Sequence, residues 1–214
     1  MKFVAAFTII AALTLDSCEP AATFDKPQPD NVTALAFFPQ RLEGKYLAAD
    51  QASLVLISDK LITRHYDFDF KVQKDSLDSS YKIIDDTLVN IADGTKEGII
   101  LKGDTMIQHV NWIDTLFNIS DVNVVKKFKG YYFLNNHYSD NAWEVKKVSL
   151  KNGQLAVASI SDKDDIQKLK EITETTRDTT STRFSLTRRQ FKSFVRQHGF
   201  GEQEIFDRII ENGR

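Results

Sequence analysis

Paired acids are among the residues of this chain whose side chains could perform catalysis. Three such pairs occur, at Asp67/Asp69, Asp85/Asp86 and Asp164/Asp165. Glycoside hydrolysis needs two carboxylates that face each other across a cleft, about 5 to 9.5 Å apart, and adjacency along the chain does not provide this. Asp67 and Asp69 alternate with aromatic residues, as on the wet face of a strand, and Asp164 and Asp165 suit a helix N-terminus. These pairs therefore do not predict a glycosidase.

Histidines offer a second route to chemistry, either as bases or as metal ligands. Four are present, and they lie far apart in the chain, at His65, His109, His137 and His198. None belongs to an H-E-x-x-H motif, so a zinc site would have to be assembled entirely by the fold. The chain also contains no G-x-S-x-G and no G-x-x-x-x-G-K-[ST] motif. The sequence thus predicts a protein that is not an enzyme and has neither a metal nor another cofactor.

Cys18 is the only cysteine, and it follows an apolar run from Phe3 to Leu15. A membrane-spanning helix needs about 20 apolar residues, so this run has the length of a signal-peptide core instead. Leu15-Asp16-Ser17-Cys18 resembles the lipobox of bacterial lipoproteins, although Asp16 replaces the usual small or aliphatic residue. The resemblance implies that residues 1–17 are a signal peptide and that Cys18 becomes a lipidated N-terminus that carries acyl chains such as palmitate.

Residues 18–33 contain three of the four prolines. Proline fixes φ and lacks an N–H group, so the segment is expected to be an extended tether. The whole chain is 42% hydrophobic and 27% charged, as is typical of a folded globular protein. Its net charge of −2 argues against nucleic acid as a partner. The folded part is expected to begin at residue 34.

A lipobox, a Pro-rich tether and a β-rich body together are similar to surface lipoproteins of Bacteroidetes. Glu19 follows the lipidated position, where Asp would signal retention in the inner membrane. The resemblance implies an outer-membrane lipoprotein that faces the periplasm or the cell surface. Its partner is the membrane, to which acylated Cys18 attaches it. It implies no activity and no particular protein partner.

Residues 34–160 show the alternation typical of short strands. In the stretch from Tyr66 to Val72 the apolar and charged residues alternate, so one face is buried and one is wet. Turn sequences separate the runs, and Asn152-Gly153 is the clearest because a type I′ turn needs positive φ at both central residues. The pattern predicts an antiparallel meander, as an open sheet or a barrel-like body.

Residues 161–214 change to a helical period and are expected to pack on the sheet. Asp164 and Asp165 begin one helix, and Thr187 caps a second helix whose apolar face carries Phe191 and Phe194. Residues 202–210 are predicted to form a short third helix. The fold class is therefore α+β, mainly β, with two or three C-terminal helices.

Two segments share an apolar-x-Gly-x-Tyr pattern, Leu42 to Tyr46 and Phe128 to Tyr132. They would arise from two similar β modules or from two unrelated strand starts. The first of them also resembles the Gly-x-aromatic motif at the first strand of lipocalins, with Tyr46 in place of Trp. That resemblance implies a cavity for a small apolar ligand.

Asp followed by Ser or Thr and then by an apolar residue or Thr recurs in the chain. The acceptor residues are Ser76, Thr87, Thr105, Thr115 and Thr179. The triplets resemble the O-glycosylation acceptor of Bacteroidetes envelope proteins, and a glycan would require an exposed position. The same triplets also begin many hairpins, because Asp favours turns and Thr favours strands.

A basic segment covers the second predicted helix. It contains Arg188, Arg189, Lys192 and Arg196, with no acid between residues 183 and 196. The first two lie in the first helical turn, where the helix dipole disfavours cations. An anionic envelope component such as phosphate would explain them, as would ion pairs with residues 162–165 or with Glu202 and Glu204.

Three functions remain in view from the sequence. The first is a lipid-anchored, non-enzymatic binding or assembly module of the envelope. The second is a lipocalin-like carrier, which requires a closed sheet around an apolar pocket, whereas the module requires a core filled by side chains. The third, a carbohydrate-active enzyme, requires two acids in one groove.

Overall fold

The computed structural model describes residues 20–160, 163–173 and 182–210. The fold is mainly β, with 52% strand and 13% helix, which confirms the predicted fold class. The chain divides into two compact units. The small unit is Tyr66–Trp112, and the large unit combines Pro20–His65 with Ile113–Arg214.

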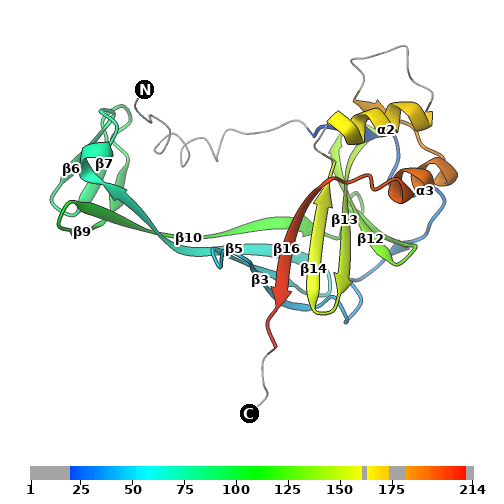
Figure 1. Cartoon of the computed structure of the whole chain (residues 1–214), viewed down its shortest axis with the longest axis horizontal. Helices are drawn as coiled ribbons and strands as arrows, with labels where there is room; N and C mark the ends of the chain where they lie inside the picture. Colours follow the sequence, from blue (N-terminus) through cyan, green and yellow to red (C-terminus); the bar gives the residue numbers. More distant parts are fainter. Residues whose placement is uncertain (1–19, 161–162, 174–181, 211–214) are drawn as a thin grey trace. The chain divides into compact units, whose positions relative to one another are not determined.

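The large unit is built from two antiparallel meanders (Figure 1). The first consists of β3 (Gly44–Ala48), β4 (Ser53–Ile57) and the start of β5 (Leu61–Gln73). The second consists of β11 (Val124–Phe128), β12 (Tyr131–Ser139), β13 (Ala142–Lys151) and β14 (Gln154–Ser159). The short strand β2 (Ala34–Leu35) pairs with β11 at one edge. The sheet is not closed, so the barrel-like alternative is not observed.

The last strand, β16 (Glu202–Arg208), joins the two meanders by pairing antiparallel with β14 and with β3. The predicted third helix at residues 202–210 is therefore wrong. A helix this short is marginal by itself, whereas the free edges of β14 and β3 offer main-chain partners on both sides. Phe206 lies opposite Leu155 and Ala48 and is buried, so the strand also closes part of the core.

Two cores flank the second meander, because its strands are buried on both faces. Tyr132 and Leu134 point into one core, together with Tyr46, Val55 and other residues of the first meander. Phe133, between them in sequence, points into the other core, as strand alternation requires. An uninterrupted run of aromatic and aliphatic residues thus lets one strand contribute side chains to two cores.

Helices α2 (Lys163–Thr173) and α3 (Arg188–Arg196) cover the second of these cores. Phe191 and Phe194 of α3 are fully buried there, which confirms the predicted docking of this helix on the sheet. A Cβ atom on Gly199 would lie 2.3 Å from the Phe194 ring. Only glycine therefore allows the chain to turn closely beneath that ring.

The predicted tether is wrong for residues 20–33, because this segment packs into the large unit. Strand β1 (Thr23–Phe24) pairs with β13 and, in parallel, with β15 (Arg183–Phe184). Phe24 is fully buried. The prolines do not prevent this, since Pro20 precedes β1, Pro27 and Pro29 follow it, and their carbonyl groups can still accept hydrogen bonds.

Two buried polar side chains bind that proline segment. Asn135 exchanges hydrogen bonds with Gln28: its Nδ2 donates to the Gln28 carbonyl at 3.0 Å, and its Oδ1 accepts from the Gln28 N–H at 2.5 Å. Lys126 Nζ donates to the carbonyls of Pro27 and Pro29 at 2.8 and 2.9 Å. Burial lowers the pKa of Lys126, and Asp30 partly offsets this. The N-terminal segment is therefore fixed to β11 and β12.

The small unit contains a three-stranded antiparallel sheet of β6 (Tyr81–Ile84), β7 (Thr87–Asn90) and β8 (Lys96–Gly98). The short helix η1 (Lys74–Ser76) follows β5, and β9 (Ile100–Lys102) pairs with β10 (Thr105–Asn118). Strands β5 and β10 contribute residues to both units. The core of the small unit is formed by Val72, Leu88, Ile99 and Met106.

The predicted hairpin turn at Asn152-Gly153 is present between β13 and β14. Both residues have positive φ, at 52° and 81°, which a two-residue hairpin requires.

Within the described ranges, neither helix has the length and apolar character needed to traverse a bilayer.

Candidate functional site

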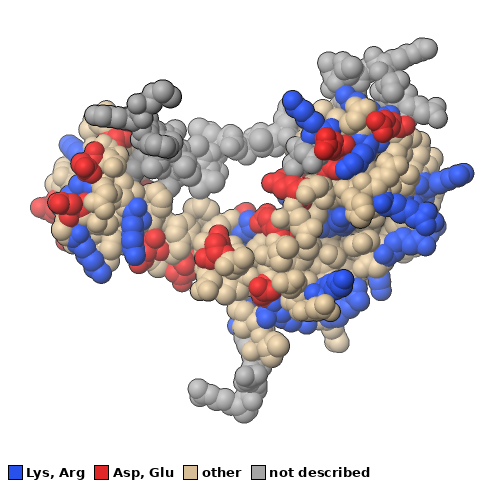
Figure 2. Space-filling view, viewed as in Figure 1, with Lys and Arg blue, Asp and Glu red and all other residues tan. Residues whose placement is uncertain are grey.

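A depression of about 410 Å³ lies beside α3 in the large unit. It is lined by Phe128, Lys129, Arg188, Arg189 and Lys192, and we call it the basic depression. Figure 2 shows Lys and Arg side chains gathered over this part of the large unit. Three of the four cations singled out in the sequence thus line one concave surface.

The start of α3 is fixed by a capping box, which places Arg188 and Arg189 at the rim. Thr187 N–H donates to Gln190 Oε1 at 2.9 Å, and the Thr187 hydroxyl accepts from the Gln190 N–H at 3.3 Å. Gln190 Nε2 also donates to the Ile172 carbonyl of α2 at 3.0 Å. The orientation of the first helical turn is therefore held from two directions.

The floor and the opposite rim come from the turn between β11 and β12. Phe128 ends β11, and the Arg188 guanidinium carbon lies 5.2 Å from the centre of its ring. Lys129 has a φ of 52° and Gly130 a φ of 87°, so the chain reverses tightly here. This turn brings Lys129, which is not part of the basic segment in the sequence, to the cations of α3.

The cations of the basic depression repel one another. The pKa of Lys192 is lowered, first by the charge of Arg196, then by Lys129, with smaller effects from desolvation, Arg188 and Arg189. Arg196 thus belongs to the same electrostatic cluster. Within the part of the chain that the structure describes, no carboxylate lies within 4.0 Å of any of these five cations.

The ion pairs that were an alternative explanation of the basic segment are made elsewhere. Asp165 is fully buried, and its carboxylate accepts from the Gly201 N–H at 2.6 Å and from Lys168 at 3.3 Å. Glu204 pairs with Arg64. That alternative is wrong for these two acids, while residues 161–162 lie outside the described part.

The groups that line this surface are suited to binding an anion. Arginine presents two parallel N–H donors to a phosphate or carboxylate, and lysine adds point charges. An incoming anion would also relieve the mutual repulsion of the five cations, because each would gain an opposite charge. The chemistry available here is therefore recognition of a multiply charged anion.

The remaining candidates for chemistry do not assemble into a comparable site. In the small unit His109 lies between Asp69, at 3.2 Å, and Asp67, at 3.5 Å, and all three side chains are more than half exposed. This group could not be predicted from the sequence, because His109 is 40 residues away from Asp69 along the chain. His137 packs edge-on against Trp143, and His65 contacts Thr63. No group of three or more candidate ligands is placed to hold a metal among the described residues.

The candidate glycosylation residues divide by exposure. Ser76 and Thr115 are exposed, whereas Thr87 and Thr105 are partly buried. Thr87 and Thr105 are also the first residues of β7 and β10, which agrees with the alternative that Asp-Thr triplets begin hairpins. Cys18 and Thr179 lie outside the described residues.

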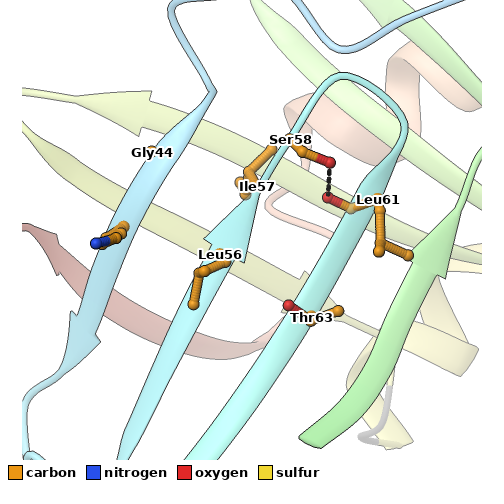
Figure 3. A pocket seen from close by; sticks show the side chains of 7 residues that line it. Gly44, Leu56, Ile57, Ser58, Leu61 and Thr63 are labelled. Atoms are coloured by element: carbon orange, nitrogen blue, oxygen red, sulfur yellow. Dashed lines mark hydrogen bonds between the residues drawn. The ribbon is translucent and has the colours of Figure 1, made fainter.

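A second, mostly apolar depression of about 340 Å³ lies on β3, β4 and β5 within the large unit. Figure 3 shows Leu56, Leu61 and Thr63 at this site, with the Ser58 hydroxyl donating to the Leu61 carbonyl at 3.4 Å. Gly44, at its edge, has a φ of 144° and closely approaches the Arg208 guanidinium. Arg208 in turn covers the buried Tyr46 ring, so the Gly-x-Tyr motif has a packing role.

Comparison with protein-family models, with curated proteins and with solved structures finds no match to this chain.

Proposed function

We propose that this protein is a lipid-anchored envelope protein whose body binds an anionic envelope component at the basic depression. The observation that carries the proposal is the gathering of four cations, Lys129, Arg188, Arg189 and Lys192, around one concave surface. Arg196 adds its charge nearby, since it contributes to the lowered pKa of Lys192. Such an arrangement lowers the stability of the unbound surface, because the like charges repel. A bound anion would offset the repulsion between these cations.

A binding module is favoured over a carrier because side chains fill the interior of the large unit. Tyr46, Tyr132, Phe117 and Phe206 are fully buried in a single cluster where a carrier would hold its ligand. The open sheet also departs from a lipocalin-like container. A carbohydrate-active enzyme gains no support, since Asp165 is engaged internally and Asp85 and Asp86 lie on the turn between β6 and β7.

The binding experiment uses the mature chain from residue 18 with Cys18→Ala, so that no acyl chain contributes. We expect this chain to sediment with lipopolysaccharide vesicles at low salt and to be released as salt increases. Arg188→Gln/Arg189→Gln/Lys192→Gln should lose this binding. Lys82→Gln/Lys96→Gln/Lys102→Gln removes three exposed lysines of the small unit and should bind as the parent does. Absence of binding by the parent at low salt would refute the proposal.

Lipidation is tested in cells by labelling with radioactive palmitate. Replacement of Cys18 by Ala removes the acyl acceptor, so we expect labelling to disappear and the unprocessed precursor to accumulate. Cys18→Ser is the matched control with a retained polar group, and it should behave like the alanine variant. Equal labelling of the parent and of both variants would exclude Cys18 as the acceptor.

A carrier of a small apolar ligand is the second candidate, and the depression on β3, β4 and β5 is the observation that favours it. Its volume of about 340 Å³ falls within the range of ligand sites, which is about 300 to 1,000 Å³. We expect a fluorescent apolar probe to bind there only if this candidate is correct. Leu56→Gln should then abolish its fluorescence increase.

A further inference from the structure

The N-terminal segment and the basic depression belong to adjoining parts of the large unit. Thr23 pairs with Arg183, and Phe24 pairs with Phe184, four residues before the start of α3. The Phe24 ring also lies 6.4 Å from the ring of Phe191 on α3. The strand that follows the lipidation position is therefore packed against the helix that carries the cations.

The corrected fold leaves very little chain between the lipid and the folded body. The described part begins at Pro20, two residues after Cys18, and two extended residues span about 7 Å. From Cys18 to Phe24 the chain spans at most about 20 Å. A flexible tether would have allowed the body to move away from the bilayer, whereas this connection holds it at the headgroup layer.

At that distance the charge of the membrane surface acts on the body. The Debye length is about 8 Å at physiological salt, and each Lys or Arg near an anionic surface contributes about 1 kcal/mol to binding. Headgroup phosphates match the cations of the depression in charge, and arginine binds them through paired N–H donors.

We propose that the basic depression binds the phosphates of anionic headgroups in the same membrane that holds the acyl chains of Cys18, so that anchor and depression together fix the orientation of the body. This inference rests on the proposed function, and it names the partner as a lipid of the membrane that also holds the acyl anchor. The depression then adds a second attachment to the acylated cysteine. Its main effect is on orientation, because several acyl chains already anchor stably.

The test exploits the fact that Cys18 is the only cysteine. The mature chain is coupled through Cys18 to a maleimide lipid in vesicles of phosphatidylcholine, with or without phosphatidylglycerol. Hydrogen exchange of the peptides that cover residues 187–196 is then compared between the two vesicle types. We expect exchange to be several-fold slower on the vesicles that contain phosphatidylglycerol.

Variants show whether the cations cause this protection. Arg188→Gln/Arg189→Gln/Lys192→Gln should exchange equally fast on both vesicles, whereas Lys82→Gln/Lys96→Gln/Lys102→Gln should keep the difference. For the uncoupled Cys18→Ala chain, the first triple variant should partition roughly a hundredfold more weakly onto phosphatidylglycerol vesicles. Inorganic phosphate added to neutral vesicles should give no protection.

Three results would overturn the inference. They are equal exchange on both vesicle types, equal protection in the first triple variant, and protection by inorganic phosphate alone. If the uncoupled chain binds lipopolysaccharide vesicles while the coupled chain shows no protection, the proposed function is retained. The inference that the depression binds the membrane of its own anchor is then refuted. Because the coupling is chemical, the result is independent of whether Cys18 is lipidated in cells.

Discussion

The two units differ in the size of the apolar cores that stabilise them. The large unit has two apolar cores, and its central strand β12 contributes Tyr132 to one and Phe133 to the other. The small unit has one core of four buried residues and leaves Ile84, Ile91 and Ile100 about half exposed. Burial of a large apolar side chain contributes about 1.5 to 3 kcal/mol, so the large unit carries most of the folding free energy.

The two units also differ in their net charge. The small unit contains nine acidic and five basic residues, although the whole chain has a net charge of only −2. The large unit is correspondingly basic and carries the depression beside α3. The comparison shows that a near-neutral total can conceal a surface suited to anions, because opposite charges are separated into different units.

The largest effect is expected from a charge placed in the core beneath α3. Phe194 is fully buried and lies 5.2 Å from the ring of Phe200, so Phe194→Asp both removes the aromatic packing and buries an unpaired carboxylate. Loss of the ring alone costs about 3–5 kcal/mol. We expect urea denaturation, followed by circular dichroism, to show an unfolded or loosened large unit. Phe194→Leu should cost much less, and an unchanged midpoint for Phe194→Asp would contradict the assigned core.

The same kind of change in the small unit should act locally. Leu88 is a member of its four-residue core, and Leu88→Ala should cost about 2–3 kcal/mol. Hydrogen exchange should accelerate in residues 66–112 and remain unchanged in β12, β13 and β14. Equal acceleration in both units would mean that they unfold as one cooperative structure, which would remove the distinction between them.

Removal of the surface cations should leave stability almost unaltered. Arg188→Gln/Arg189→Gln/Lys192→Gln deletes charges that repel one another, so the thermal midpoint should stay nearly unchanged, with any small shift in favour of the folded state. Differential scanning calorimetry measures the midpoint, with Lys82→Gln/Lys96→Gln/Lys102→Gln as the control. A loss comparable to that of Leu88→Ala would assign a structural role to the basic depression.

The smallest expected effect is an acid sensitivity of the small unit. Hydrogen bonds from Ser80 hold the pKa of Asp78 below 3.8, and those from Thr95 do the same for Asp93. The ionised forms are therefore favoured in the folded state, and this stabilisation is present above pH 3.8 and is lost as the pH falls through the lowered pKa. The protection factors of residues 78–95, which correct for the intrinsic pH dependence of amide exchange, should fall over that range. Asp78→Asn/Asp93→Asn should abolish this pH dependence.

Local patterns predicted the helix α3 and the strands well. Thr187 and Gln190 form a capping box four residues long, and Phe191 and Phe194 define its buried face, so all the required information lies within one segment. The turn at Asn152-Gly153 was predicted for the same reason. The four cations of α3 were found because they are neighbours along the chain.

Features that depend on distant residues could not be predicted. Residues 202–210 form a strand because the edges of β14 and β3 accept it, and neither edge is visible in the local sequence. The segment after Cys18 is fixed by Asn135 and Lys126, about 100 residues away. Lys129 joined the basic depression for the same reason, through the turn before β12 rather than through helical spacing.

The position of β16 has a consequence for how the protein is made. Both meanders are synthesised before this strand, yet it provides the hydrogen bonds that unite them, with six residues paired to β14 and three to β3. A chain that is exported as its N-terminus predicts cannot complete the large sheet until its C-terminal end has crossed the inner membrane. Until then β14 and β3 remain open edges, at which another chain could pair. For such an exported chain, the large sheet would be completed only when translocation ends, and truncation before residue 202 would leave the edges of β14 and β3 unpaired.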